Sequence, residues 1–391
     1  MTAGLDNWLA AHEEGLIAVR RDLHRHPELG RREHRTTALL MERLRAAGLE
    51  PRVLAAGTGV VCDVGGGDGP LVVLRADIDA LPLPDAKDVP YRSTVEGVCH
   101  ACGHDVHTAV VLGAGLALAA LGSPGRRVRL VFQPAEELMP GGGLDVVAEG
   151  LLDDAAATFA LHCDPSLDVG LVGLRAGPIT AAADAVQVLL SGPGGHTSRP
   201  QNTVDLVHAL ASLAVGLPAA LSRLVDPRAG MLLVWGHVAA GTAANAIPPD
   251  GVLAGTLRVL DRSAWQAAPD LVARLVQELV APFGATAELT YVRGVPPVVN
   301  DPRTTLLLTA AVQGALGRAA AVDTAQSMGG EDFAWYLEQA PGSLARLGVR
   351  TPGASAQVDL HQSAFDADER AIAVGVRVLV GAVMEVPGTF L

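Results

Sequence analysis

Two cysteines and three histidines lie within the ten-residue segment "VCHACGHDVH" (residues 98–107). Thiols and imidazoles at this density support three kinds of chemistry: a redox pair, a thiol nucleophile or a metal site. Cys99 and Cys102 have C-x-x-C spacing, but no second C-x-x-C and no thioredoxin-like context accompanies them. Cys102 and His104 are only two residues apart, so a thiol and its base can hardly align. We therefore favour a metal site with Cys102 as a ligand and Cys99 as a bystander.

Further candidate ligands follow predicted strands elsewhere in the chain. The strands are 71–74, 128–132 and 158–161, and they lead to Asp77 and Asp79, to Glu136 and Glu137, and to His162. Ligands bind beyond the carboxyl ends of the strands in open α/β sheets, so these side chains are expected at one edge. Cys and His suit Zn, and carboxylates also suit Mn, so two divalent metal ions are expected. Glu137 is then a ligand, and Glu136 is the general base that takes a proton from water.

The local geometry of the cysteine and histidine ligands can also be predicted. Side chains two apart share a face of an extended segment, so we expect Cys102 and His104 on one side of such a segment. Asp105 is expected to cap the helix that follows. The other candidate imidazoles are expected to be packed or surface histidines rather than ligands: His24, His26, His107 and His237.

The elements expected to position these residues alternate between helix and strand. Two helical patterns in residues 12–48 precede the three strands, which predicts an α/β domain with a largely parallel sheet. From Ala183 the expected order becomes β-α-β-β-α-β, a ferredoxin-like unit. Its expected strands are 184–191, 230–239, 251–260 and 286–293, and its helices are 203–224 and 262–283. The expected domains are a catalytic domain of residues 1–178 and 294–391 and an inserted domain of residues 179–293, with a terminal helix from Ala367.

Composition excludes several classes of partner. A net charge of −13 over 391 residues argues against nucleic acid. The N-terminus shows no secretory pattern, and the apolar runs are shorter than the ~20 residues that span a bilayer, so we expect a cytoplasmic chain without a membrane partner. Four cysteines in a chain of this length do not form a disulfide framework.

Nine segments of the sequence occur in a recognisable order. They are "LHRHPELG", "RADIDALP", "HACGHDVHTA", "FQPAEE", "ALHCDP", "SGPGGHTSRP", "NAIP", "GGEDFAWY" and "LHQSAF". Together they resemble the amidohydrolase branch of the dinuclear metallopeptidase family that contains aminoacylase and carboxypeptidase G. That branch includes hippurate hydrolase, N-acyl-amino-acid amidohydrolases and auxin-conjugate hydrolases. The resemblance covers essentially the whole chain and implies a zinc-peptidase-like catalytic domain with an inserted lid and dimerisation domain.

The resemblance also implies roles for individual residues. The metal ligands would be Cys102, His104, Glu137, His162 and His361, with Glu136 as the base. Asp79 would support the ligands, and Asp77 stands where other branches place a ligand histidine. His196 would reach the neighbouring subunit's active site to stabilise the oxyanion, Asn245 and Arg258 would bind the substrate's carboxylate, and Gly330, within residues 329–332, would line the pocket. Cys99, Val106 and Gln201 depart from the usual branch wording, which affects pocket shape and substrate preference.

These observations predict a homodimer that hydrolyses the amide bond of N-acyl amino acids, which are small-molecule substrates. The alternatives are a dipeptidase or carboxypeptidase on the same site, a catalytically silent metal-binding protein, and a Cys102 thiol hydrolase that would survive a chelator. The adjacent Glu136 and Glu137 speak against a silent protein, because a binder needs no base beside a ligand. The motifs do not specify the acyl group or the amino acid.

Overall fold

The structure is a computed structural model that describes residues 2–66, 68–123, 125–354 and 358–388. The chain forms two compact units. The first unit comprises Met1–Gly177, Val299–Ala325 and Asp332–Leu391, and the second comprises Pro178–Val298 and Gln326–Glu331. The long segment Pro178–Val298 of the second unit is therefore an insertion in the sequence of the first, and Gln326–Glu331 joins it from further along the chain.

In the described residues, the first unit contains an eight-stranded sheet of order β1-β2-β4-β3-β5-β16-β6-β15. Its strands are β1 (Arg52–Val53), β2 (Val60–Val64), β3 (Leu71–Asp77), β4 (Arg127–Gln133), β5 (Ala155–Asp168), β6 (Val172–Leu174), β15 (Ala321–Asp323) and β16 (Gly342–Arg350). The central strands β4, β3, β5 and β16 pair in parallel. The pairs β1–β2, β2–β4 and β16–β6 are antiparallel. The predicted mostly parallel sheet is confirmed.

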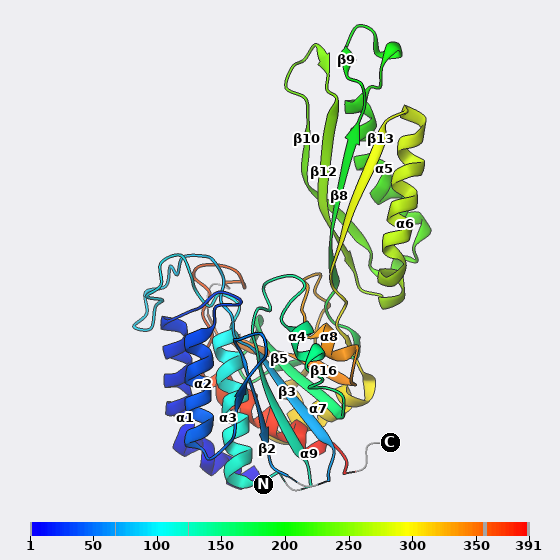
Figure 1. Cartoon of the computed structure of the whole chain (residues 1–391). Coiled ribbons are helices and arrows are strands. Elements are labelled where there is room, and N and C mark those ends of the chain that lie inside the picture. Colours follow the sequence, from blue (N-terminus) through cyan, green and yellow to red (C-terminus); the bar gives the residue numbers. More distant parts are fainter. Residues whose placement is uncertain (1, 67, 124, 355–357, 389–391) are drawn as a thin grey trace. The chain divides into compact units, whose positions relative to one another are not determined.

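Helices and one face of this sheet share an apolar core. The helices of the first unit are α1 (Thr2–Arg25), α2 (His34–Ala46), α3 (His104–Leu121), α4 (Gly143–Ala148), α7 (Pro302–Leu316), α8 (Ala334–Leu337) and α9 (Arg370–Glu385), with a 3-10 turn at Arg318–Ala320. Buried side chains of α1, α2, α3, α7 and α9 belong to one hydrophobic cluster with the strands. Figure 1 shows α1, α2 and α3 side by side. The terminal helix begins at Arg370 rather than at Ala367, because the residues before it form a loop.

The opposite face of the central strands carries polar side chains. Leu74 on β3, Leu161 on β5 and Leu347 on β16 belong to the apolar cluster. Side chains alternate between the two faces of a strand, so the intervening residues lie on the other face. These residues include Arg75 and Asp77 on β3, His162 on β5 and Arg346 on β16, all buried. This polar face is where the predicted chemistry lies.

The second unit is the predicted β-α-β-β-α-β fold. Its main elements are β8 (Ala182–Ser191), α5 (Leu206–Leu224), β10 (Leu232–Ala240), β12 (Asp250–Val259), α6 (Arg262–Val280) and β13 (Thr286–Val295). The antiparallel sheet has the order β10-β12-β8-β13. In Figure 1, α5 and α6 lie side by side against it. The expected ferredoxin-like order is confirmed, although α5 begins at Leu206, where Asp205 caps it by accepting from the His208 amide.

Short elements complete the two units. They are β7 (Gly177–Pro178), β9 (Gly195–His196), β11 (Ala246–Ile247), β14 (Val299–Asn300) and 3-10 turns at Pro200–Asn202, Pro227–Ala229 and Ala281–Phe283. Two described helices, α3 and α5, are long and apolar enough by composition to cross a membrane. That is weak evidence, since core helices share this composition, and α3 is 78% buried.

Candidate metal centre

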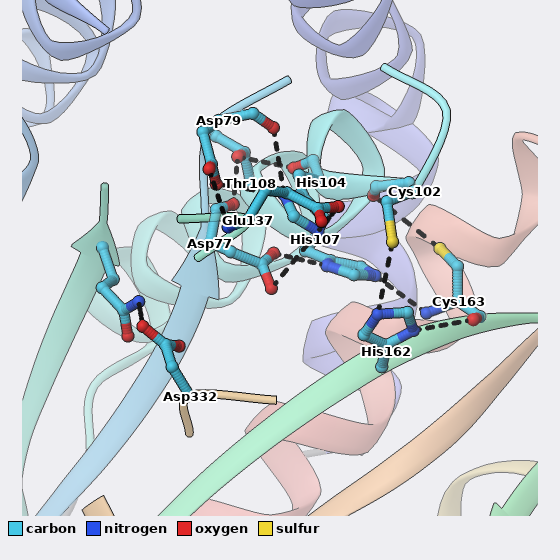
Figure 2. A network of polar contacts seen from close by, with 12 residues as sticks. Asp77, Asp79, Cys102, His104, His107, Thr108, Glu137, His162, Cys163 and Asp332 are labelled. Carbon is cyan, nitrogen blue, oxygen red and sulfur yellow. Dashed lines mark hydrogen bonds and ion pairs between the residues drawn. The ribbon is translucent and has the colours of Figure 1, made fainter. Parts of the chain in front are cut away.

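The structure brings the predicted ligands of the first unit together. Three groups of ligand atoms lie within 4.8 Å of one another: Cys102, His104 and His162; Cys102, Glu137 and His361; and His104, Glu136 and Glu137. Because these groups share members, they form one continuous cluster. Figure 2 shows Cys102 and His104 from one segment close to Glu137 and His162 from two others.

Cys102 and His104 do not lie on an extended segment, so that expectation is wrong. Cys102 lies in a bend, Gly103 has a φ of 87°, and His104 is the first residue of α3. A side chain at Gly103 would also bring its Cβ to 2.6 Å from the Cys163 Sγ. The glycine thus permits both the left-handed turn and the close approach to β5. The turn allows the thiol and the imidazole to face the same cluster.

In His104 and His162, a hydrogen bond at Nδ1 leaves Nε2 available to bind a metal. The Nδ1 of His104 donates to the Asp79 carbonyl at 3.0 Å, and the Nδ1 of His162 donates to the Cys163 carbonyl at 2.9 Å. A carbonyl only accepts, so each Nε2 is the atom left with a lone pair when the ring is neutral. The Nε2 of His162 lies 3.6 Å from the Cys102 Sγ, and the buried Nε2 of His104 has no hydrogen-bond partner in the described residues. Such second contacts orient metal-binding imidazoles.

His162 lies inside a strand, which differs from the prediction that it follows one. β5 continues to Asp168, because β16 pairs with it from Gly342 to Arg350. The sequence indicates an earlier end of this strand, because Pro165 follows and proline is uncommon inside strands. The position of His162 on the polar face, rather than the strand terminus, directs its ring toward Cys102.

The carboxylate of Asp79 supports Glu137 and His104. Its Oδ2 accepts from the Glu137 backbone amide at 3.0 Å, and its Oδ1 lies 3.3 Å from the His104 Nδ1. The His361 Nε2 lies 3.3 Å from Oε1 of Glu137. The His361 amide donates to the Ala101 carbonyl at 2.7 Å, which ties its loop to the cysteine segment.

Backbone strain occurs on both sides of the cluster. His361 has a φ of 61° and Ala135, just before Glu136, has a φ of 57°. Left-handed conformations are uncommon for such residues and concentrate at functional sites. The Ala135 amide donates to the buried Glu33 carboxylate at 2.8 Å, which holds the strained turn in place.

Asp77 is engaged by side chains that are not predicted ligands. Its Oδ2 accepts from Arg75 Nη1 at 2.7 Å, and its Oδ1 accepts from the His107 Nδ1 at 2.6 Å. The Nε2 of His107 accepts from the Cys163 amide at 2.8 Å, so both nitrogens of this imidazole are used. Arg75 also donates to Asp332 at 2.6 Å. Figure 2 shows the contact between Asp77 and His107 next to His104 and His162.

Burial and neighbouring charges set the protonation of the metal-free ligands. Burial opposes the charge of His104, but Asp77 and Asp79 raise its pKa to about 10. Burial, followed by the positive charge of Arg346, lowers the pKa of His162 well below its ordinary value. Burial and the carboxylates of Glu137 and Glu136 raise the pKa of the Cys102 thiol. A bound cation reverses this preference, because it stabilises the thiolate and displaces the imidazole proton.

The donor set fits two divalent metal ions. It combines a thiol, three imidazoles and a carboxylate, and two of its buried atoms, His104 Nε2 and Glu137 Oε1, have no hydrogen-bond partner in the described residues. Unpartnered buried polar atoms are costly unless a ligand satisfies them. The five residues therefore have the chemistry and the open valences that a dinuclear site requires.

Asp105 does not cap α3, because its carboxylate points into the interior. It lies in the first turn, buried, and its Oδ2 accepts from Arg20 Nε and His24 Nδ1, both at 2.7 Å. The residue at the N-cap position is Gly103. Burial raises the cost of the charge, but Arg20 and His24 hold the pKa of Asp105 well below its ordinary value.

In the second unit, the structure brings His196 and Asn245 together but places Arg258 elsewhere. β9 pairs with β11, where His196 lies opposite Ala246, and Asn245 precedes that residue. Asp250 of β12 pairs with Ser191, whereas Arg258 pairs with Ala183. At ~3.3 Å per residue, Arg258 lies roughly 26 Å along the strand from Asp250. Asn245 precedes β11 of the separate β9–β11 pair, which leads into the Asp250 end of β12, whereas Arg258 lies near the other end of β12.

The loop predicted to line the pocket has two distinct parts. The Gly329 carbonyl accepts from the Ala181 amide at 3.1 Å, and Gly330 follows it in the same loop. Asp332 is buried and accepts from Arg75, from the Gln133 amide at 2.6 Å and from the Gly143 backbone at 2.8 Å. Asp332 thus contributes to the frame of the first unit.

The sequence did not identify the buried residues that contact Asp77 and Asp105. Arg75 precedes Asp77 by two residues, and a period of two in a strand could have placed both on one face. Arg20 and His24 recur four residues apart on α1, which places them on one helix face. Their partner Asp105 is distant in sequence, so only the fold reveals that contact.

Comparisons with known proteins agree with this geometry. Residues 73–385 match the model of peptidase family M20/M25/M40. A Rhodococcus jostii protein with a glutamate–cysteine ligase name is 50% identical over 94% of this chain, and the chain spans only 46% of that protein. An N-acetyl-L-cysteine deacetylase of Bacillus subtilis is 38% identical, over 93% of this chain and 86% of the relative.

A solved structure extends the likeness to the fold. The YxeP protein of Bacillus subtilis, described as a dinuclear metal-binding peptidase of the M20 family, has a TM-score of 0.84 and 33% identity, and the match covers 96% of this chain and 98% of that one. The family match covers more than half of the chain and includes all five clustered candidate ligand residues. The chain therefore belongs to peptidase family M20/M25/M40 and is a metal-dependent amidohydrolase.

Proposed function

We propose that the enzyme cleaves the amide bond of N-acyl amino acids and releases a carboxylate and a free amino acid. The observation that carries this proposal is the convergence of five ligand residues with Glu136 directly before the ligand Glu137. The deacetylase name of the Bacillus subtilis relative supports an acylated amino acid as the substrate.

The five proposed ligands and Glu136 have different roles in the reaction. Two divalent ions held by Cys102, His104, Glu137, His162 and His361 would polarise the amide carbonyl and ionise a water. Glu136, 7% exposed, accepts the proton of the attacking water and later delivers it to the leaving nitrogen. The carboxylate of Asp79 keeps Glu137 and His104 in position through the contacts described above.

The second unit would supply the substrate contacts. His196 donates to the oxygen that gains negative charge, and Asn245 and Arg258 bind the substrate's carboxylate. The Nδ1 of His196 accepts from the Ser198 amide at 3.1 Å, which leaves Nε2 as the donor. Asn245 is connected to the Asp250 end of β12 and Arg258 lies near its other end, so the two residues would meet at one carboxylate if two chains contribute them. This separation supports an active site completed by a second subunit.

A homodimer formed through the inserted domain would meet this requirement. The helix α5 carries Val215 at 75% exposure and Leu224 at 57%. The edge strand β10 adds the exposed side chains of Val234 and Val238. Exposed apolar patches and an unpaired strand edge are typical of surfaces that associate.

The metal and the compartment complete the proposal. A thiol together with three imidazoles favours Zn, and the carboxylate also suits Mn. All four cysteines are free, which suits a reducing cytoplasm. The domain limits expected from sequence, with residues 179–293 as the lid and dimerisation domain, belong to the same proposal.

A substrate screen tests this function. Metal-loaded enzyme is assayed on N-acetyl, N-benzoyl and N-indolylacetyl amino acids and on dipeptides, with Mn or Zn, before and after chelation. We expect hydrolysis of N-acyl amino acids that disappears on chelation and returns with metal. Preferential cleavage of dipeptides would instead indicate a dipeptidase, and full activity after chelation would indicate a Cys102 thiol hydrolase.

A further inference from the structure

Arg346 lies beside the metal centre on the polar face of the sheet. On β16 it pairs with His162 of β5 on one side and with Gly173 of β6 on the other. The flanking residues Ala345 and Leu347 belong to the apolar core of the opposite face. By strand alternation, Arg346 shares the face of the ligand His162. Its side chain is 9% exposed.

No hydrogen bond or ion pair holds the Arg346 guanidinium among the described residues. The two other buried arginines of this unit are fully engaged. Arg75 donates to Asp77, Gln133 and Asp332, and Arg20 donates to Asp105, Asp366 and Glu369. A guanidinium stays charged at any physiological pH, so burial without an anion is costly. Arg346 is therefore a largely buried cation that no carboxylate of the described residues neutralises.

Arg346 lies between a closely packed strand and a strand that carries a proposed metal ligand. A Cβ placed on Gly173 would meet Thr324 Cβ at 2.8 Å, Leu167 Cδ1 at 3.0 Å and Arg346 Cβ at 3.2 Å. The β6 side of the Arg346 Cβ is thus closely packed. On the β5 side the neighbour is His162, which lies on the same face of the sheet. The charge therefore lies beside the proposed metal centre, where substrate would bind.

We propose that Arg346 binds a second carboxylate of the substrate and makes the enzyme selective for N-acyl amino acids with an anionic group besides the α-carboxylate. The inference rests on the proposed function, in which Asn245 and Arg258 receive the α-carboxylate. A guanidinium and a carboxylate form two parallel hydrogen bonds, and this geometry distinguishes a carboxylate from an amide. The second carboxylate belongs either to the amino-acid side chain or to the far end of the acyl group.

Matched substrate pairs test the selectivity. One pair is N-acetylglutamate and N-acetylglutamine, and the other is N-succinyl-leucine and N-succinamoyl-leucine. In each pair only a carboxylate is exchanged for a carboxamide. Charge-assisted hydrogen bonds contribute about 1.5–3 kcal/mol. In one of the two pairs, the kcat/KM of the native enzyme should therefore be roughly 10- to 150-fold higher for the carboxylate substrate than for its carboxamide. The pair that responds identifies whether the side chain or the acyl group carries the anion.

Variants of metal-loaded enzyme connect that preference with Arg346. Arg346→Leu should remove it, lowering kcat/KM for the acid and leaving the amide within about threefold, while Arg346→Lys should restore part of it. Arg350→Leu is the control, because Arg350 is on the same strand and pairs with Asp168 at 2.6 Å. An equal loss on acid and amide, or an unchanged preference in Arg346→Leu, would overturn the proposal.

A binding measurement separates this inference from the proposed function. Calorimetry compares glutarate with its monoamide, using metal-loaded native enzyme and Arg346→Leu with equal metal content. We expect the native enzyme to bind glutarate more tightly and the variant to lose that difference. Failure to hydrolyse any of the four substrates would count against the proposed function, whereas equal binding of the two ligands by native enzyme would count against Arg346.

Discussion

Arg20 and Asp105 form a buried ion pair in which Nε donates to Oδ2 at 2.7 Å, with each side chain 1% exposed. Asp105 directly follows the ligand His104 at the start of α3. Arg20 also contacts Asp366 at 2.6 Å, and Asp366 lies in the same loop as the ligand His361. One guanidinium therefore connects two segments that carry metal ligands.

Replacing Arg20 should weaken both folding and metal binding. Arg20→Leu removes the permanent cation that pairs with buried Asp105 and leaves that carboxylate with His24 alone, which should lower the free energy of unfolding by about 3–5 kcal/mol. Metal content after dialysis should fall because the two ligand segments lose their common contact. Arg377→Leu is the control, since its pair with Asp6 is partly exposed and contributes at most about 1 kcal/mol. Denaturant unfolding and metal analysis check both effects, and equal stability of the two variants would contradict the role of Arg20.

Glu136 and Glu137 should respond differently to the same amide substitution. Glu136→Gln removes the proton acceptor and should lower kcat by roughly 10²-fold or more with little change in metal content. Glu137→Gln should instead lose metal, because its carboxylate is the proposed ligand. Steady-state kinetics with metal analysis measures both quantities. A Glu136→Gln protein that loses metal and keeps its rate would reverse the two assignments.

His24 should make stability depend on pH. Burial disfavours its charged form, but Asp105 and Asp85 raise its pKa above the ordinary 6.5, while Arg20 opposes the rise. Tyr91 and His100 also face this ring. Protonated His24 thus stabilises the fold fully below about pH 6.5, and the contribution is lost as pH rises through the folded pKa.

Thermal unfolding of native protein and His24→Gln checks this sign. Both are measured metal-free, because metal affinity itself depends on pH. The difference in Tm should be larger at about pH 5.5 than at about pH 9. A difference that is constant, or that grows with pH, would show that His24 is neutral in the fold.

Cys99 should take no part in redox control. Its side chain is fully buried, its Sγ lies 3.9 Å from the Pro84 carbonyl, and burial raises its pKa to about 11. Little thiolate is therefore present to form a disulfide with Cys102. Mild oxidation of metal-free native protein, Cys99→Met and Cys99→Ala, followed by assay with and without reductant, should give equal losses. Reductant-reversible loss in the native protein alone would establish a disulfide.

The sequence predicts features that depend on local pattern. The order of elements, the inserted β-α-β-β-α-β unit and the identity of the clustered ligands follow from apolar periodicity, strand ends and motif resemblance. The prediction of an extended segment around Gly103 was wrong. It relied on the alternation of side chains along extended backbone, but the glycine permits a left-handed turn there. The role of Asp105 was wrong because its partner Arg20 is far away in sequence. The sequence does not predict the position of Arg346 beside His162, because that position depends on the pairing of β16 with β5.

The insertion of the second unit between β5 and β16 also affects how the chain is made. On the ribosome, β5 with His162 emerges well before β16 and His361, because the whole Pro178–Val298 segment is translated between them. At ~5–20 residues per second, that interval is on the order of ten seconds. Throughout it, the nascent strand β5 has an open edge, and an early metal ion meets an incomplete set of ligands. Maturation of the metal centre is therefore among the last events in the biosynthesis of this enzyme.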